Sequence, residues 1–268
     1  MKETIVVTLT LSMLSAVLVG CTATAPAAPV TPSSQPATAI PSPTPAHVTL
    51  QYIGNACVLI TAPDGTRIVS DPYDNYSRPS QLTRLPSDLE ADAVTISHAH
   101  PDHNNAKGVK GASQVIAEPG TYQVGMIKVT GYEGREGSPS GPSDMRETII
   151  VFEIGDVKIV HLGDSGLITQ TEVLAGIANA DVILVNIDGY VIPSDQIVPF
   201  MRQADARTIM PVHYSLSATA RWVGAPTIDE FLETLPAGTQ VVRLGSEIQV
   251  TPGMPYQVAV LTPLALAK

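Results

Sequence analysis

The pattern of apolar and polar residues after position 46 predicts a chain made mainly of β-strands. Apolar residues alternate with polar ones over 48–53, and a second apolar run follows over 56–61. The sequence Pro63-Asp64-Gly65-Thr66 predicts a hairpin turn into a third strand over 67–70. Further runs of the same kind predict strands over 93–96, 113–117, 126–130, 148–154, 157–162, 181–187, 207–212, 241–250 and 256–261.

Helices are expected only in the second half of the chain. The periodicity predicts a helix over 171–179, and Ser194 and Thr227 are expected to cap helices that end near residues 204 and 235. Residues 131–144 contain four Gly and two Pro and therefore predict a loop. Because strands come first and helices then alternate with strands, the predicted fold class is α/β, with two packed sheets and helices on both outer faces.

The first 20 residues have the pattern of a targeting segment. Lys2 gives a positive start, and an apolar run extends over 5–19, which suits a signal peptide and is short for a bilayer span of about 20 residues. The run ends in Leu18-Val19-Gly20-Cys21, which resembles a bacterial lipobox. We therefore predict a lipoprotein signal peptide over 1–20 and a lipidated Cys21 as the mature N-terminus. The alternatives are a transmembrane anchor or an ordinary secretory signal followed by an incidental cysteine.

The segment after Cys21 separates this leader from the folded part of the chain. Residues 22–46 are mostly Ala, Pro, Thr and Ser and carry no charge, which predicts an extended tether. The expected organisation is therefore a linker over 21–46 and a folded domain over 47–268, held by the lipid at the bacterial cell surface or in the periplasm. The other cysteine, Cys57, lies in an apolar run and is expected to be a buried thiol without a disulfide partner.

Composition and charge narrow the class of protein. Of the 268 residues, 44% are hydrophobic and 15% are charged, so the chain can bury a large core. The net charge is −10 and no basic cluster occurs, which argues against nucleic acid as a partner. A small molecule is the expected substrate, and the sequence does not indicate the oligomeric state.

One loop, residues 97–105, carries most of the candidate chemistry and is called the metal loop below. Directly after the strand predicted over 93–96, four potential metal ligands fall within six residues, and Pro101 ends regular strand pairing. Lone histidines are usually surface or core residues, but three of the six in the chain occur in this loop. One tetrahedral site cannot easily take four ligands from so short a loop. We therefore expect a split into two metals, with His98 and His100 on the first and Asp102 and His103 on the second.

Together with this loop, five other short sequences resemble a known family. They are Tyr52-Ile53-Gly54-Asn55-Ala56-Cys57, Asp71-Pro72-Tyr73, Glu118-Pro119-Gly120-Thr121-Tyr122, His161-Leu162-Gly163-Asp164 and Pro211-Val212-His213-Tyr214. In this order they resemble the metallo-β-lactamase superfamily, in the branch of zinc-dependent hydrolases that includes ascorbate-phosphate lactonases. The resemblance covers the chain from about residue 48 onward. It implies an αββα sandwich of two mixed sheets, with the metals in a cleft at one edge.

The resemblance also implies roles for residues outside the metal loop. Asp164 would bridge the two metals, His213 would be the last ligand of the second metal, and Asp71 would accept a hydrogen bond beneath the loop. The expected cofactor is Zn²⁺, with two ions, and Mn²⁺ or Fe²⁺ as alternatives. Asp102 and Asp164 are the candidate catalytic carboxylates.

This chain departs from the family pattern at the first metal. The family usually supplies one more histidine there, but no histidine occurs between His103 and His161. Glu133 is the candidate replacement, because the family position falls near it. His161 is expected to be a buried, hydrogen-bonded residue rather than a ligand, since strand alternation places it and Asp164 on opposite faces. Asn55 stands where the family often has histidine.

The expected activity is hydrolysis of an ester, lactone, amide or phosphodiester by a metal-bound hydroxide. Ser165 has no base partner in the sequence pattern, so a serine hydrolase is not expected. The alternative is a surface lipoprotein that keeps the sandwich but has lost catalysis and serves as a binding or scaffold module. Metal content distinguishes the two, because only the enzyme needs both metals.

Overall fold

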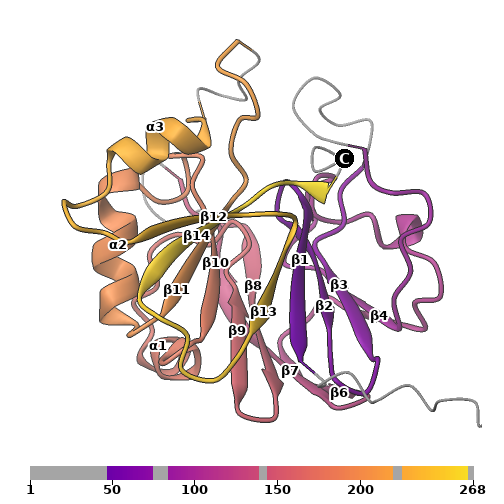
Figure 1. The fold of residues 1–268 in the computed structure, drawn as a ribbon. Coiled ribbons are helices and arrows are strands. Elements are labelled where there is room, and N and C mark those ends of the chain that lie inside the picture. The colour runs from indigo at the N-terminus through magenta and orange to yellow at the C-terminus, as the bar shows by residue number, and fades with distance from the viewer. Residues whose placement is uncertain (1–46, 75–83, 139–143, 220–224, 265–268) are drawn as a thin grey trace, which may run out of the picture. The chain divides into compact units, whose positions relative to one another are not determined.

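A computed structural model describes residues 47–74, 84–138, 144–219 and 225–264. The predicted signal peptide, Cys21 and the linker lie outside these ranges. Two mixed β-sheets form the described domain: six strands in the order β13-β1-β2-β3-β4-β5, and eight in the order β12-β14-β11-β10-β9-β8-β7-β6 (Figure 1). In chain order the first nine strands are β1 (Val48–Gly54), β2 (Cys57–Thr61), β3 (Arg67–Ser70), β4 (Ala93–Thr95), β5 (Gln114–Ile116), β6 (Gly120–Val124), β7 (Ile127–Arg135), β8 (Arg146–Ile154) and β9 (Val157–His161).

The remaining elements alternate between helix and strand before ending in three strands. They are α1 (Thr171–Ile177), β10 (Val182–Asn186), α2 (Ser194–Gln203), β11 (Thr208–Val212), α3 (Ile228–Glu233), β12 (Val241–Leu244), β13 (Glu247–Val250) and β14 (Gln257–Leu261), with a short 3₁₀ helix, η1 (Ala106–Gly108), after the metal loop. The parallel strands β9, β10, β11 and β14 adjoin an antiparallel meander of β6 to β9. The two mixed sheets of the predicted fold are therefore confirmed.

The main core lies between the two sheets. Leu50 and Ile60 from the six-stranded sheet and Phe152 and Leu184 from the eight-stranded sheet are fully buried in one cluster. Burial of apolar surface of this extent is the main driving force that holds the sheets together. Strand alternation sends the neighbouring side chains of the same strands to the outer faces.

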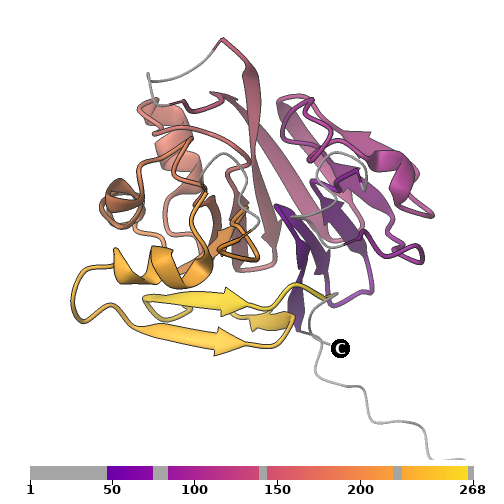
Figure 2. The ribbon, with the colours of Figure 1, turned by 90° about the horizontal axis from the view of Figure 1, so that it is seen from above.

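The outer faces are covered differently from each other. The three α-helices pack on the eight-stranded sheet, where Ile177 of α1, Phe200 of α2 and Phe231 of α3 join a second buried cluster (Figures 1 and 2). The outer face of the six-stranded sheet is covered by loops and η1, through residues such as Leu85 and Val109. Within the described residues, all three α-helices therefore lie on the eight-stranded sheet, and the six-stranded sheet is covered by η1 and apolar loop residues.

The loop predicted over 131–144 is wrong in its first part. Strand β7 continues through Gly131 and Gly134 to Arg135, in antiparallel register with β8. A Cβ at Gly131 would lie 2.9 Å from the Thr148 side chain, and a Cβ at Gly134 would lie 2.9 Å from that of Ile149. These glycines therefore let β8 side chains pack closely across the strand rather than ending it.

Smaller differences concern single elements. Strand β6 was not predicted, and the run over 241–250 divides into β12 and β13, which belong to different sheets. Ser194 is the first residue of α2 rather than its cap, which is Pro193. The prediction for Thr227 is confirmed, because it forms a reciprocal capping box with Glu230 at the start of α3. None of the helices in the described ranges is long and apolar enough to cross a bilayer.

Candidate metal centre

Loops at the carboxyl ends of several strands meet at one edge of the two sheets. The metal loop follows β4, Asp164 follows β9 after two residues, and His213 directly follows β11. The structure gathers all six predicted ligands, with one addition, into two groups whose donor atoms lie within 4.8 Å of one another. The first group contains His98, His100, Glu136 and Asp164, and the second contains Asp102, His103 and His213. His98 and His100 fall in the first group and Asp102 and His103 in the second, which is the division predicted for the metal loop.

Asp164 lies between the two groups. Its Oδ1 is 3.4 Å from Nε2 of His103, and its Oδ2 is 3.8 Å from Nε2 of His98. Asn186 donates a hydrogen bond of 2.7 Å to Oδ1 and so fixes the carboxylate. Burial raises the pKa of Asp164, but the positive charges of His103, His213 and His98 outweigh burial and hold the pKa well below its usual range. Asp164 is therefore an ionised carboxylate with one oxygen toward each group.

His103 presents an unused ring nitrogen to the centre. Its Nδ1 is 2.8 Å from Oδ2 of Asp71, and its Nε2 is buried without a hydrogen-bond partner in the described residues. Burial lowers the pKa of His103, but Asp164 and Asp71 outweigh burial and raise it to about 9. A buried imidazole nitrogen without a hydrogen-bond partner, close to the Asp102 and Asp164 carboxylates, fits a divalent cation. Such a cation would bind the nitrogen and the carboxylate oxygens together.

Asp71 holds the metal loop from below, as the family resemblance implies. It accepts hydrogen bonds from the Ser97 amide (2.8 Å) and from the Ser97 hydroxyl (2.6 Å) in addition to the one from His103. The side chain is fully buried. A carboxylate that accepts from Nδ1 of His103 leaves Nε2 as the free donor atom, which is how outer carboxylates orient metal-binding histidines.

The first group is the more open of the two. Nε2 of His98 is 2.9 Å from Nδ1 of His100, and the two rings meet edge to face. The His100 side chain is 40% exposed, and its Nδ1 is 3.7 Å from Oε1 of Glu136. Solvent therefore reaches the centre from the side of His100.

The carboxylate of the first group is Glu136 and not Glu133. Glu133 lies within β7, its side chain is 58% exposed, and it pairs with Arg135 at 3.7 Å. Glu136 follows the end of β7 and bridges to Ser165, beside Asp164, and its side chain is only 12% exposed. Glu136 lies in the same stretch of sequence, but the family position pointed to Glu133, three residues earlier.

His161 is not available as a ligand. Its Nε2 is 2.7 Å from the Ala56 carbonyl, and its Nδ1 accepts a hydrogen bond of 3.0 Å from the Gly163 amide. Both ring nitrogens are therefore engaged by backbone groups in a fully buried position. The expectation of a buried, hydrogen-bonded histidine is confirmed.

Backbone strain is concentrated around the second group. Asn55, Asp71 and His213 have φ of 52°, 49° and 59°, which side chains with a Cβ rarely adopt. The Asn55 side chain donates to the Asp102 carbonyl (2.9 Å), and the Asn55 carbonyl accepts from the His213 amide (2.9 Å). Asn55 thus ties the metal loop to the end of β11, which brings Nε2 of His213 to 3.2 Å from Oδ2 of Asp102.

Comparison with known proteins identifies the family. The family model described as a β-lactamase superfamily domain matches residues 49–213, which span the metal loop, Asp164 and His213. The chain belongs to the β-lactamase superfamily. A UPF0173 metal-dependent hydrolase of Cupriavidus taiwanensis is 26% identical over 85% of this chain and 92% of its own.

Solved structures place this superfamily member in the metallo branch. A Thermotoga maritima protein described as a Zn-dependent hydrolase of the metallo-β-lactamase superfamily aligns with a TM-score of 0.62 and 27% identity, over 80% of this chain and 98% of its own. A metallo hydrolase of Ignicoccus hospitalis shares the fold, with a TM-score of 0.53 and 20% identity over 69% of this chain and 89% of its own. The predicted superfamily is confirmed, and metal-dependent hydrolysis is the class of activity that these relatives support.

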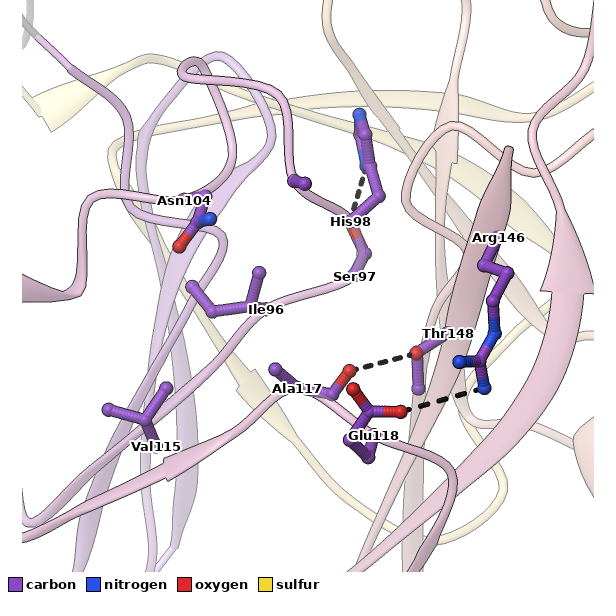
Figure 3. Close-up of a pocket in the computed structure, with 10 residues that line it drawn as sticks. Ile96, Ser97, His98, Asn104, Val115, Ala117, Glu118, Arg146 and Thr148 are labelled. Carbon is purple, nitrogen blue, oxygen red and sulfur yellow. Dashed lines mark hydrogen bonds and ion pairs between the residues drawn. The ribbon is translucent and has the colours of Figure 1, made fainter.

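A cavity of about 250 Å³ borders the metal loop of this superfamily domain (Figure 3). Its apolar wall contains Ile96, Val115 and Ala117, and the pair formed by Arg146 and Glu118 lies at its rim. Figure 3 shows the His98 imidazole pointing away from these apolar residues. The cavity therefore lies behind the loop and not over the ring nitrogens that face the centre.

Two other reactive side chains are accounted for. Cys57 is a buried free cysteine, and burial raises the pKa of its thiol well above the usual value, so it is not a nucleophile. The Ser165 hydroxyl donates to the Gly166 carbonyl. The superfamily domain therefore shows no activated side-chain nucleophile at these two positions.

Proposed function

We propose that this superfamily member is a hydrolase that uses two divalent cations to cleave an ester, lactone, amide or phosphodiester in a small molecule. The observation that carries the proposal is the arrangement of Asp164, whose two oxygens face the two groups of candidate ligands. The buried Nε2 of His103 supports it independently, because that atom has no protein hydrogen-bond partner in the described residues.

The donor atoms fit zinc in both places. The first ion would be held by Nε2 of His98, Nδ1 of His100 and carboxylate oxygens of Glu136 and Asp164. The second would be held by Asp102, Nε2 of His103, Nε2 of His213 and the other oxygen of Asp164. Two imidazoles and two carboxylates form a donor set that zinc accepts, and one that Mn²⁺ or Fe²⁺ also accepts.

The residues of the chain would divide the work as follows. Bound cations supply Lewis acidity and lower the pKa of a coordinated water toward neutrality. Asp164 would contribute a carboxylate oxygen to each site, and Asn186 keeps this carboxylate in place. Asp71 fixes the tautomer of His103. Substrate would enter beside His100, which is the most exposed ligand candidate.

The competing function is a binding or scaffold module without catalysis. It was motivated by the missing histidine and by the asparagine at position 55. Glu136 lies beside His98, His100 and Asp164 and is our candidate for the missing ligand, and Asn55 ties the metal loop to β11 through two hydrogen bonds. Both observations favour the enzyme.

The test is metal content together with turnover. Elemental analysis of the purified full chain should give two metal equivalents, and a panel of lactones, esters, β-lactams and phosphodiesters should contain at least one substrate. Removal of metal with a chelator should abolish that turnover, and Zn²⁺, Mn²⁺ or Fe²⁺ should restore it. A chain that binds no metal or one equivalent, and hydrolyses nothing on the panel, would support the binding module.

We further propose that the enzyme is an exported lipoprotein that is anchored through Cys21. The support is the sequence of residues 1–21, which lies outside the described structure. A Cys21→Ser variant should be released from the membrane fraction or remain unprocessed. Unchanged fractionation and processing of this variant would contradict the anchor.

A further inference from the structure

Glu147 is a buried acid that the proposed reaction does not yet use. It is the second residue of β8, its side chain is fully buried, and neither of its carboxylate oxygens has a hydrogen-bond partner in the described residues. Burying a carboxylate without such partners is costly and persists only where a nearby positive or polar group compensates for it. The neighbours of Glu147 therefore indicate its role.

The group that Glu147 faces is His98. Its Oε2 lies 3.2 Å from Nδ1 of His98, although the angle is not that of a hydrogen bond. The two residues are held in register by a backbone hydrogen bond of 2.8 Å from the Thr148 amide to the Ser97 carbonyl. This bond joins β8 directly to the first residue of the metal loop, so it fixes the backbones that carry the two side chains relative to each other.

Space for the carboxylate is provided by Gly163. A Cβ at this position would lie 2.0 Å from Oε1 of Glu147, and the φ of Gly163 is +57°. Any other residue would therefore displace the carboxylate and would also strain the backbone. The turn that leads to Asp164 is thus shaped around Glu147.

Hydrogen-bond directions show what the contact does to His98. The Ser97 hydroxyl donates its single hydrogen to Asp71, so toward Nδ1 of His98, at 3.0 Å, it can only accept. Nδ1 therefore carries hydrogen, and Glu147 lies beside that N–H. The other nitrogen, Nε2, faces His100 and Asp164 in the first group, and it would offer its lone pair there once the ring is neutral.

We propose that Glu147 is a positioning residue of the first metal site. Its carboxylate stabilises the Nδ1–H form of His98 and increases the basicity of Nε2, as outer carboxylates do for metal-binding histidines. The inference rests on the proposed function and extends it, because it assigns one carboxylate to one of the two metals. His103 would have Asp71 in the same role at the second metal.

The experiment compares Glu147→Gln and Glu147→Asp with wild type in the full chain. Titration of the metal-free proteins with Zn²⁺ against a competing chelator gives the affinity of each site. Glu147→Gln should weaken the first site by roughly 10–100-fold and leave the second unchanged, and Glu147→Asp should recover part of the loss. The visible spectrum of the Co²⁺-loaded variant should change at the first site only.

A matched control separates this role from structural support. Glu153→Gln makes the same chemical change in the same strand, at a partly exposed glutamate that pairs with Lys128, and should leave both affinities unchanged. The metal-free Glu147→Gln variant should still unfold cooperatively and at a temperature close to that of wild type, because the lost attraction to His98 is offset by removal of a buried carboxylate without hydrogen-bond partners.

The outcomes separate the two proposals. Wild-type affinity at both sites in Glu147→Gln would overturn the positioning role, as would equal loss of both metals together with a lower unfolding temperature of the metal-free variant. Failure of the proposed function would appear in the wild type itself, as fewer than two bound metals, and would overturn this inference with it.

Discussion

The two groups of candidate ligands differ in how firmly the protein holds them. In the second group, Asp102, His103 and His213 are all buried, and residues with strained backbone support them from below and from the side. In the first group, the His100 side chain is 40% exposed, and Glu136 comes from the end of a long hairpin strand. For the proposed two-metal enzyme, this contrast predicts that the second site binds its metal more tightly and that the first site faces water and substrate.

The largest effect is expected where the two groups meet. Asp164→Ala should lose both metals, because it removes the only side chain whose oxygens face both groups within the described residues. Turnover should fall by more than about 100-fold, since water activation and charge stabilisation are lost together. Elemental analysis and kcat measure this, with Asp156→Ala in the exposed turn after β8 as control. Full metal and full activity in Asp164→Ala would refute the division into two sites joined by this carboxylate.

The next effect should be confined to one group. Glu136→Gln should lose the first metal and keep the second, because Glu136 belongs to the first group alone. Glu133→Gln is the matched control three residues earlier and should keep both metals, since that side chain is exposed and paired with Arg135. Metal stoichiometry by elemental analysis decides between them. Loss of the first metal in Glu133→Gln but not in Glu136→Gln would show that Glu133 is the ligand.

The pH dependence of metal binding should follow the histidines. In the metal-free chain burial lowers the pKa of His98, but Glu147 and Asp164 outweigh burial and raise it to about 9, the value that His103 also reaches. Metal must displace these protons, so affinity should rise with pH up to about 9, by about tenfold per pH unit for each proton released. Calorimetric titration in buffers of different ionisation enthalpy counts the protons. No proton release below pH 9 would contradict the prediction.

Stability of the metal-free chain should show the opposite trend. A histidine whose pKa is raised on folding stabilises the fold fully below its unfolded value of 6.5, and this contribution is lost as the pH rises through about 9. The unfolding temperature of the chelator-treated protein should therefore decrease as the pH is raised from 6.5 to about 9. Bound metal should remove this pH dependence.

The smallest effect on the metals is expected from His161→Ala. The substitution leaves the Ala56 carbonyl and the Gly163 amide without their partner in a fully buried position, which should cost about 2–4 kcal/mol of unfolding free energy. Both metals should be retained at full stoichiometry. Denaturant unfolding and elemental analysis test this together, and loss of the first metal alone would show that His161 supports that site directly.

The parts of the centre that are local in the chain could be predicted from the sequence alone. Four ligands in the metal loop follow directly after an apolar strand, and the length of the loop alone divides them between two sites. Asp164 and His213 each follow the end of an apolar strand, and the family resemblance is what assigned them to the metals. Most of the individual strands follow from alternation or from apolar runs, which a strand of ordinary length shows in its own residues.

The acids that complete and support the site could be assigned only from the folded structure. Glu136 reaches the first group because β7 continues through two glycines alongside β8, and the spacing between His103 and Glu136 in the sequence does not reveal this. Glu147 stands between Arg146 and Thr148 at the start of a strand and has the sequence pattern of a surface residue. It is buried because Gly163, sixteen residues later, leaves room beside His98. Tertiary contacts set the positions of both glutamates. A local sequence pattern does not reveal which residue elsewhere in the fold will leave space for a side chain.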